Sequence, residues 1–111
     1  MAEGRIPCAV PFCRRTADAS KYEGPTKIIC GKCWRLGSAA ARRAYRIARR
    51  RERLLLARYE RECTKAEATG VAIASKRARK WWLIRRHLAR AIHDSWERVR
   101  IEATERKGGI A

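Results

Sequence analysis

Residues 28–38, IICGKCWRLGS, mark the point where a turn-rich segment gives way to a helical one. Cys30 and Cys33 stand here with two residues between them, and Gly37 closes the stretch. The segment up to Gly37 shows no sustained helical period and is punctuated by prolines and glycines: Pro7, Pro11, Gly24, Pro25, Gly31 and Gly37. The sequence therefore predicts a small turn-rich head over residues 1–37.

The composition changes at Ser38, because alanine, arginine and leucine then dominate and no glycine or proline occurs before Gly70. Apolar residues recur on one face of this stretch, so we expect a helix from Ser38 to about Ala68, with Ser38 as its N-cap. Gly70 is expected to end it. A second apolar stripe predicts another helix over roughly residues 72–106.

The two stripes should face each other, which predicts a long antiparallel two-helix hairpin over residues 38–106. Residues 107–111 contain Gly108 and Gly109 and are expected to be a disordered tail. The fold class is accordingly mostly α, with a small head before the hairpin.

Four of the five cysteines form two close pairs. Four residues separate Cys8 from Cys13, and two separate Cys30 from Cys33. Tetrahedral Zn(II) takes four such thiolates, and two tight turns can supply them without a large fold. We therefore expect these four cysteines to bind one structural zinc ion, without which the head should be disordered. Free thiol pairs or a redox-active CGKC are the alternatives, and Cys63 is expected to be a small buried hydrophobe.

The string CAVPFCRRT at residues 8–16, followed by ICGKCWRL at residues 29–36, resembles the treble-clef zinc fingers of small bacteriophage and bacterial proteins. The resemblance implies a zinc head with a short β-hairpin between the cysteine pairs. Residues 21–24 would form its turn and residues 26–29 its second strand. In many such proteins histidine is the fourth ligand, where this chain has Cys33.

The treble clef also underlies HNH nucleases, which need a histidine on the hairpin and a second metal-binding residue on the following helix. The segment between the cysteine pairs contains no histidine. The only two, His87 and His93, are six residues apart in the predicted second helix and do not share a face. We therefore expect a chain that is not an enzyme.

Lysine and arginine number 28 against 11 acidic residues, which gives a formal net charge of +17. Most of the surplus is arginine, whose planar guanidinium fits phosphate oxygens in pairs. The predicted phosphate-binding residues lie on the head and on both helices: Arg14, Arg15, Lys32, Arg35, Arg43, Arg46, Arg50, Arg53, Lys80, Arg85 and Arg86. Trp34 is expected to pack within the head and Trp82 at the rim of the helical stripe, although either could contact a base.

These features favour a zinc-stabilised, non-catalytic protein that binds DNA or structured RNA through its phosphate backbone. The alternative is a phage-encoded inhibitor or adaptor that binds an acidic surface, or the nucleic-acid channel, of a host protein. A basic amphipathic helix on an anionic membrane is a third possibility. The sequence has neither a signal peptide nor an apolar run long enough to span a membrane, which predicts a cytoplasmic location, that of the host if the protein is phage-encoded.

Overall fold

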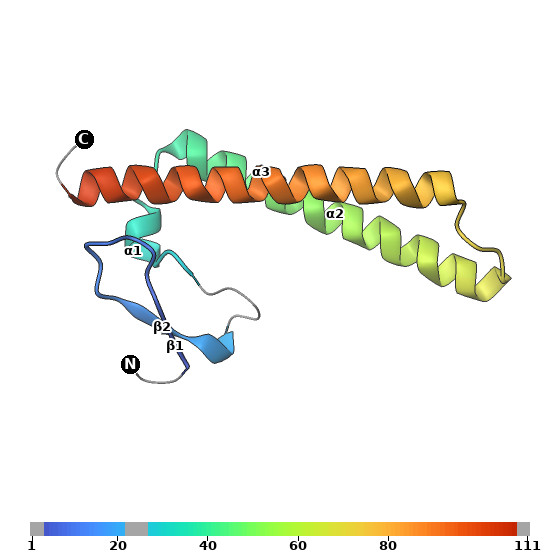
Figure 1. Cartoon of the computed structure of the whole chain (residues 1–111), viewed down its shortest axis with the longest axis horizontal. Helices are drawn as coiled ribbons and strands as arrows, with labels where there is room; N and C mark the ends of the chain where they lie inside the picture. The colour runs from blue at the N-terminus through green and yellow to red at the C-terminus, as the bar shows by residue number, and fades with distance from the viewer. Residues whose placement is uncertain (1–3, 22–26, 109–111) are drawn as a thin grey trace. The chain divides into compact units, whose positions relative to one another are not determined.

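The structure, a computed structural model shown in Figure 1, describes residues 4–21 and 27–108. Contacts divide the chain into two units, one of Met1–Arg42 with Trp96–Ala111 and one of Arg43–Ser95. The first unit thus combines the turn-rich N-terminal segment with the end of the last helix. The predicted division assigned that end to the helical hairpin instead.

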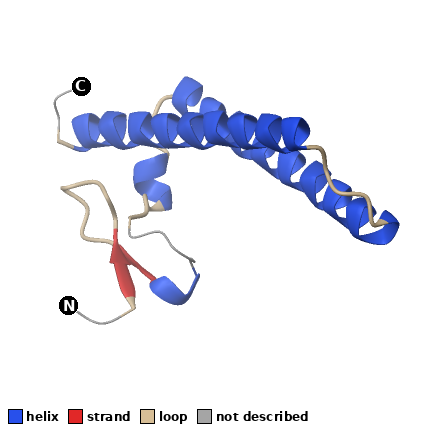
Figure 2. Cartoon of the chain, turned by 45° about the vertical axis from the view of Figure 1, so that its right-hand side comes forward, coloured by secondary structure: helices blue, strands red, loops and turns tan. Residues whose placement is uncertain are grey.

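Two short strands form an antiparallel hairpin in the first unit, drawn in red in Figure 2. Strand β1 (Arg5–Pro7) pairs with β2 (Thr16–Asp18), so that Arg5 lies opposite Asp18. The Arg5 guanidinium donates to Thr16 Oγ1 at 2.8 and 3.1 Å. This short hairpin confirms that the head contains β-structure ahead of the helices.

The described hairpin is not the one predicted between the two cysteine pairs. Strands β1 and β2 flank the loop that carries Cys8 and Cys13. The Cys8 amide donates to the Arg15 carbonyl at 2.9 Å and closes this loop. Residue 21 belongs to the 3-10 turn η1 (Ala19–Lys21), whereas residues 22–26 of the predicted turn and strand lie outside the described residues. Ile28 forms only an isolated parallel bridge with Cys8.

The chain is mostly α-helical, as predicted. A single turn, α1 (Gly31–Trp34), precedes the two long helices α2 (Ala39–Thr69) and α3 (Ser75–Lys107). Gly70 ends α2 as expected, with a φ of 70° that suits glycine. Among the residues that the structure describes, no helix has the length and apolar character needed to cross a lipid bilayer.

The start of α3 differs from the prediction by three residues. Its first helical hydrogen bond runs from the Ala78 amide to the Ala74 carbonyl at 3.0 Å, so residues 71–74 form a loop. Val71 and Ile73 are β-branched and follow the Gly70 turn, both of which disfavour an earlier start. The prediction relied on apolar periodicity, which does not register these local costs.

The N-terminus of α2 is held by a carboxylate from α3 within the first unit. Ser38 caps α2 as predicted, since its Oγ accepts the Ala41 amide proton at 3.1 Å. The Ser38 amide and hydroxyl both donate to the Glu102 carboxylate, at 2.6 and 3.1 Å, and Arg98 donates to it at 3.3 Å. A negative charge at the N-terminus of α2 also stabilises this helix through its dipole.

Gly37 allows α3 to approach closely at the same junction. A Cβ on Gly37 would lie 2.7 Å from Val99 Cγ1 and 3.3 Å from the Trp34 carbonyl oxygen. Val99 is fully buried, so it has little room to move. Any larger residue at position 37 would therefore push the end of α3 away.

We expect Glu102→Gln to destabilise the protein by about 1–2 kcal/mol at neutral pH. Hydrogen bonds from the Ser38 amide, and then from its hydroxyl and Arg98, hold the pKa of Glu102 below its ordinary value. Because this folded-state pKa is lower than the unfolded-state value of about 4.3, the stabilisation is fully present above that pH and is lost as the pH falls through the folded-state pKa.

The measurement is the difference in unfolding free energy between the native protein and the variant from pH 6 to pH 3. The difference should shrink on acidification, and any contribution from a metal ion cancels in it. Glu105→Gln is the matched control, since Glu105 is exposed on the same helix. A gap between native protein and Glu102→Gln that stays constant with pH would contradict the role of the carboxylate.

In the second unit, residues 43–69 of α2 and 75–95 of α3 run antiparallel, as predicted for a hairpin. The rings of Tyr59 and Trp81 lie 5.5 Å apart, and Arg77 pairs with Glu62 at 2.6 Å. Ala48 and Leu88 are buried. Towards the loop the predicted stripes are less well covered, since Tyr59 is 44% and Ile84 38% exposed.

Candidate metal centre

The first two cysteines lie in the loop between β1 and β2. The Cys13 amide donates to the Val10 carbonyl at 3.0 Å, which makes a tight turn between the two thiols. Val10 is fully buried beneath this turn. The loop therefore presents Cys8 and Cys13 from a closed backbone frame.

The second pair lies on the α1 turn. Cys30 occupies the N-cap position, and the Trp34 amide donates to its carbonyl at 2.8 Å. The Ala9 amide donates to the Ile28 carbonyl at 2.7 Å, which ties this segment to the first loop. The Cys30 amide donates to Cys8 Sγ at 3.4 Å, so backbone bonds bring the two cysteine pairs together.

The four sulfur atoms of Cys8, Cys13, Cys30 and Cys33 all lie within 4.8 Å of one another. Sulfur atoms bound tetrahedrally to zinc at about 2.3 Å are about 3.8 Å apart. Cys13 Sγ and Cys30 Sγ are separated by 3.7 Å, which matches that edge and is far longer than the roughly 2.05 Å of a disulfide. All five cysteines are free. The sequence-predicted cluster can hold one metal ion.

Burial and hydrogen bonds shift the pKa values of Cys8, Cys30 and Cys33 in different directions. Burial raises the pKa of Cys8, and burial together with hydrogen bonding to Cys30 raises the pKa of Cys33. Burial also opposes ionisation of Cys30, but hydrogen bonds from the Cys33 amide and thiol lower its pKa to about 7. A divalent cation would supply the positive charge that stabilises buried thiolates, and its binding would displace the protons of the thiols.

The end of α3 covers one side of the cluster. Ala103 is fully buried in the same group as Cys8, Val10 and Cys33. The Lys107 ammonium lies 3.8 Å from Cys33 Sγ. Arg106 donates to the Leu36 carbonyl, and a Cβ on Gly108 would lie 2.8 Å from the Phe12 ring. The last turn of α3 is therefore part of the wall around the four thiols.

Sequence reasoning missed Lys107 and Glu102, and placed position 107 in a disordered tail. Position 107 is instead the last residue of α3, and of the predicted tail only residues 109–111 lie outside the described part of the chain. The contacts of Lys107 and Glu102 join positions 74 and 64 residues apart. The sequence signal that could have pointed to Lys107 is the pair of basic residues, Arg106 and Lys107, in the last turn of the helix. The helix dipole alone explains basic residues at this position, so the signal does not indicate a metal site.

We expect Lys107→Met to weaken metal binding about tenfold, because partners just outside a ligand shell commonly contribute this much. Four thiolates around a divalent ion leave two negative charges, which a nearby ammonium offsets. Competition with a chromophoric chelator measures the change, and Lys107→Arg should retain most of the native affinity. Lys32→Met is the control, since Lys32 is exposed and lies between two ligands in the sequence. An equal effect of both methionine variants would contradict a specific role for Lys107.

The fold and this cluster define a small, mostly helical protein with a tetracysteine site that can hold one metal ion. No family model matches the chain, and no curated protein or solved structure matches it significantly.

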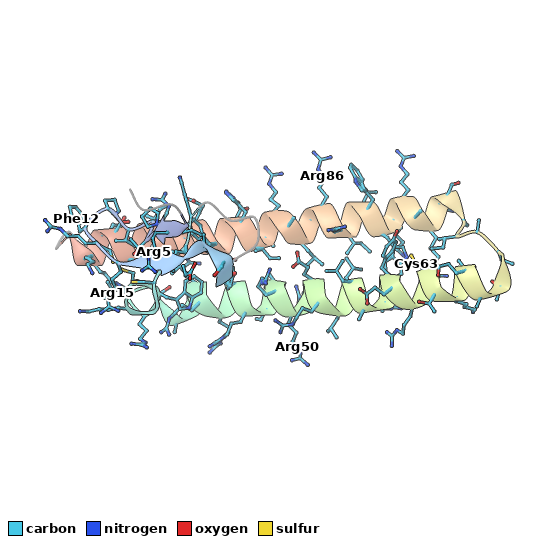
Figure 3. All side chains as sticks on the ribbon, turned by 90° about the horizontal axis from the view of Figure 1, so that it is seen from below. Arg5, Phe12, Arg15, Arg50, Cys63 and Arg86 are labelled. Atoms are coloured by element: carbon cyan, nitrogen blue, oxygen red, sulfur yellow. The ribbon has the colours of Figure 1, made fainter. Side chains whose placement is uncertain are left out.

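All eleven predicted phosphate-binding residues are exposed, and within residues 4–21 and 27–108 none of them forms an ion pair. They do not make one surface. Arg50 extends from the outer edge of α2, whereas Arg86 extends from the opposite edge of the hairpin, on α3 (Figure 3). Four of the eleven, Arg14, Arg15, Lys32 and Arg35, belong to the first unit beside the cysteines in the sequence.

The remaining sequence-predicted residues are placed as follows. Trp34 is half-buried, while Trp82 is 58% exposed with the Arg86 guanidinium 5.5 Å from its ring centre. His87 and His93 are exposed on α3. Cys63, predicted to be buried, is half-buried on α2 and lies outside the sulfur cluster.

Proposed function

We propose that this protein is a zinc-stabilised, non-catalytic nucleic-acid-binding protein that contacts the phosphate backbone with an arginine face of α2. The observation that carries the proposal is the exposure of four arginines that lack a carboxylate partner in the described part of the chain: Arg43, Arg46, Arg50 and Arg53. All four are exposed, and none has a carboxylate partner among the described residues. Other arginines nearby do have one, for example Arg49 with Glu52 at 3.3 Å.

The spacing of these residues suits a row of phosphates. Intervals of three, four and three residues place them along one helix face, and at 1.5 Å per residue they extend over about 15 Å. Phosphates of one DNA strand advance about 3.4 Å per base pair, so the row matches about four steps. Backbone contacts of this kind do not read sequence, which favours binding to duplex DNA or structured RNA of any sequence.

Zinc is the metal that the donor set favours. Thiolates are soft ligands, and a tetrahedral site of four cysteines is typical of structural zinc. The arrangement of knuckle, spacer and helical turn supports a treble-clef head. This head would hold the backbone around the cysteines in a fixed conformation. The basic residues next to the cysteines, Arg14, Arg15, Lys32 and Arg35, would then add positive charge from fixed positions.

The proposal assigns no catalysis to this centre. Four protein ligands would fill a tetrahedral ion and leave no position for water or substrate. Both histidines lie on exposed positions of α3, where His93 contacts Asp94 at 3.5 Å. Within residues 4–21 and 27–108, the candidate ligands that gather at this centre are the four cysteines, which leaves no further side chain there to hold a metal-activated water.

The test is binding to short duplex DNA, duplex RNA and single strands by fluorescence anisotropy as salt rises. For four phosphate contacts, affinity for duplex DNA should fall about a hundredfold between 50 and 200 mM salt. The zinc-loaded protein is used, and an acidic protein of similar size serves as a control polyanion. Affinity that does not change with salt, or no binding at 50 mM, would exclude the proposed function.

A further inference from the structure

A hollow of about 840 Å³ lies along the seam between α2 and α3 in the second unit. The apolar part of its lining comes from Leu55 of α2, Ala74 of the connecting loop, and Trp81, Leu83 and Ile84 of α3. Leu83 is 52% and Ile84 38% exposed, so two helices alone do not cover these side chains. We call this hollow the hairpin groove.

The charged part of the lining is entirely basic: Arg58, Lys76, Arg77, Arg79 and Lys80. Arg77 pairs with Glu62 at 2.6 Å. The other four are exposed and have no ion pair in the described part of the chain. The groove thus combines uncovered aliphatic surface with unpaired positive charge.

This combination selects among the possible occupants. A nucleic-acid backbone would pair with the cations but offers no aliphatic surface for Leu83 and Ile84. A second copy of the same groove would bring its own cations against these. A bilayer surface meets convex or flat faces, whereas this seam is hollow. An amphipathic helix with an acidic polar face satisfies both the apolar and the basic part of the lining.

We propose that the hairpin groove binds an acidic amphipathic helix of a partner protein. Its apolar side chains would lie against Leu55, Leu83 and Ile84, with carboxylates facing Arg58, Lys76, Arg79 and Lys80. The site goes beyond nucleic-acid binding, since Arg43, Arg46, Arg50 and Arg53 do not line it. A chain with both sites would connect an acidic protein segment to nucleic acid.

The test uses a labelled synthetic peptide of about 18 residues, with leucines at helical spacing and glutamates elsewhere, and a second peptide with lysines in place of the glutamates. Fluorescence anisotropy measures their binding to the zinc-loaded, full-length protein. The glutamate peptide should bind and the lysine peptide should not. Leu83→Asp should weaken binding at least tenfold.

Leu54→Asp is the matched control, because Leu54 is 57% exposed on α2 and does not line the groove. It should leave peptide affinity unchanged, and circular dichroism should show both variants folded. Similar binding of both peptides, equal loss in both variants, or no binding at 100 μM would overturn the proposal. So would a native dimer that Leu83→Asp dissociates, because a second copy would then occupy the groove.

The two proposals fail separately. Leu83→Asp should leave affinity for duplex DNA unchanged, since Leu83 belongs to α3 and lines a groove that contains none of the four arginines of the α2 face. If Leu83→Asp instead weakens DNA binding and leaves the peptide unaffected, the groove is a nucleic-acid site and the partner-helix proposal is wrong.

Discussion

Replacing Cys30 and Cys33 together with serine should abolish metal binding and leave the N-terminal segment unfolded. These residues supply two of the four sulfurs, and Cys33 is also a fully buried member of the apolar cluster. Structural zinc in small modules contributes about 10–16 kcal/mol of apparent binding free energy, which a head of this size cannot replace by packing.

Native mass spectrometry gives the metal content, and proton–nitrogen correlation spectra give the order of the head. Signals from residues 4–18 should collapse to unfolded positions in the double variant. Most of the helical circular dichroism should remain, because residues 43–95 contain none of the four ligands. Removing the metal from the native protein with a chelator should have the same effect.

Cys63→Ser is the matched control, since Cys63 is the fifth free thiol and lies outside the cluster. It should retain one metal ion and a folded head. The tetracysteine site would be contradicted by a double variant that keeps its metal, or by an equal loss in Cys63→Ser.

Replacing Arg43, Arg46, Arg50 and Arg53 with alanine should weaken binding to duplex DNA by about a thousandfold at 0.1 M salt. Counterion release from four phosphates contributes between three and four decades of affinity at this concentration. Alanine favours helix, so α2 should remain folded. Anisotropy with the same duplex measures the loss.

The control removes the same amount of charge from arginines that face carboxylates. Arg49, Arg77, Arg98 and Arg100 pair with Glu52, Glu62, Glu102 and Glu97 respectively. Their replacement by alanine should weaken DNA binding by less than about tenfold. Guanidinium groups that already pair with carboxylates contact fewer phosphates and therefore release fewer counterions from the DNA. Equal losses in the two sets would show that net charge, rather than the arginine face, sets the affinity.

The long helices and the cysteine cluster could be predicted because their signals are local or chemically restrictive. Absence of glycine and proline between Ser38 and Gly70 leaves a helix as the consistent conformation, and these two residues mark its ends. Two close cysteine pairs have few arrangements other than convergence on one ion. Their convergence is observed to within 4.8 Å.

The hairpin position could not be predicted, since strands of three residues are too short to show alternation of apolar and polar residues. The position of the end of α3 beside the cysteines could not be predicted either. Lys107 reaches Cys33 only because the chain returns to its N-terminal segment, and no local pattern encodes that return. Sequence reasoning likewise placed Arg50 and Arg86 in one functional set, whereas they extend from opposite edges of the hairpin (Figure 3).

The slope of the logarithm of DNA affinity against the logarithm of salt concentration tests the arginine face most directly. Each phosphate contact contributes about 0.9 to this slope, so the native protein should exceed the four-arginine variant by about 3.6. Equal slopes for the two proteins, with both folded and zinc-loaded, would show that Arg43, Arg46, Arg50 and Arg53 do not contact phosphate.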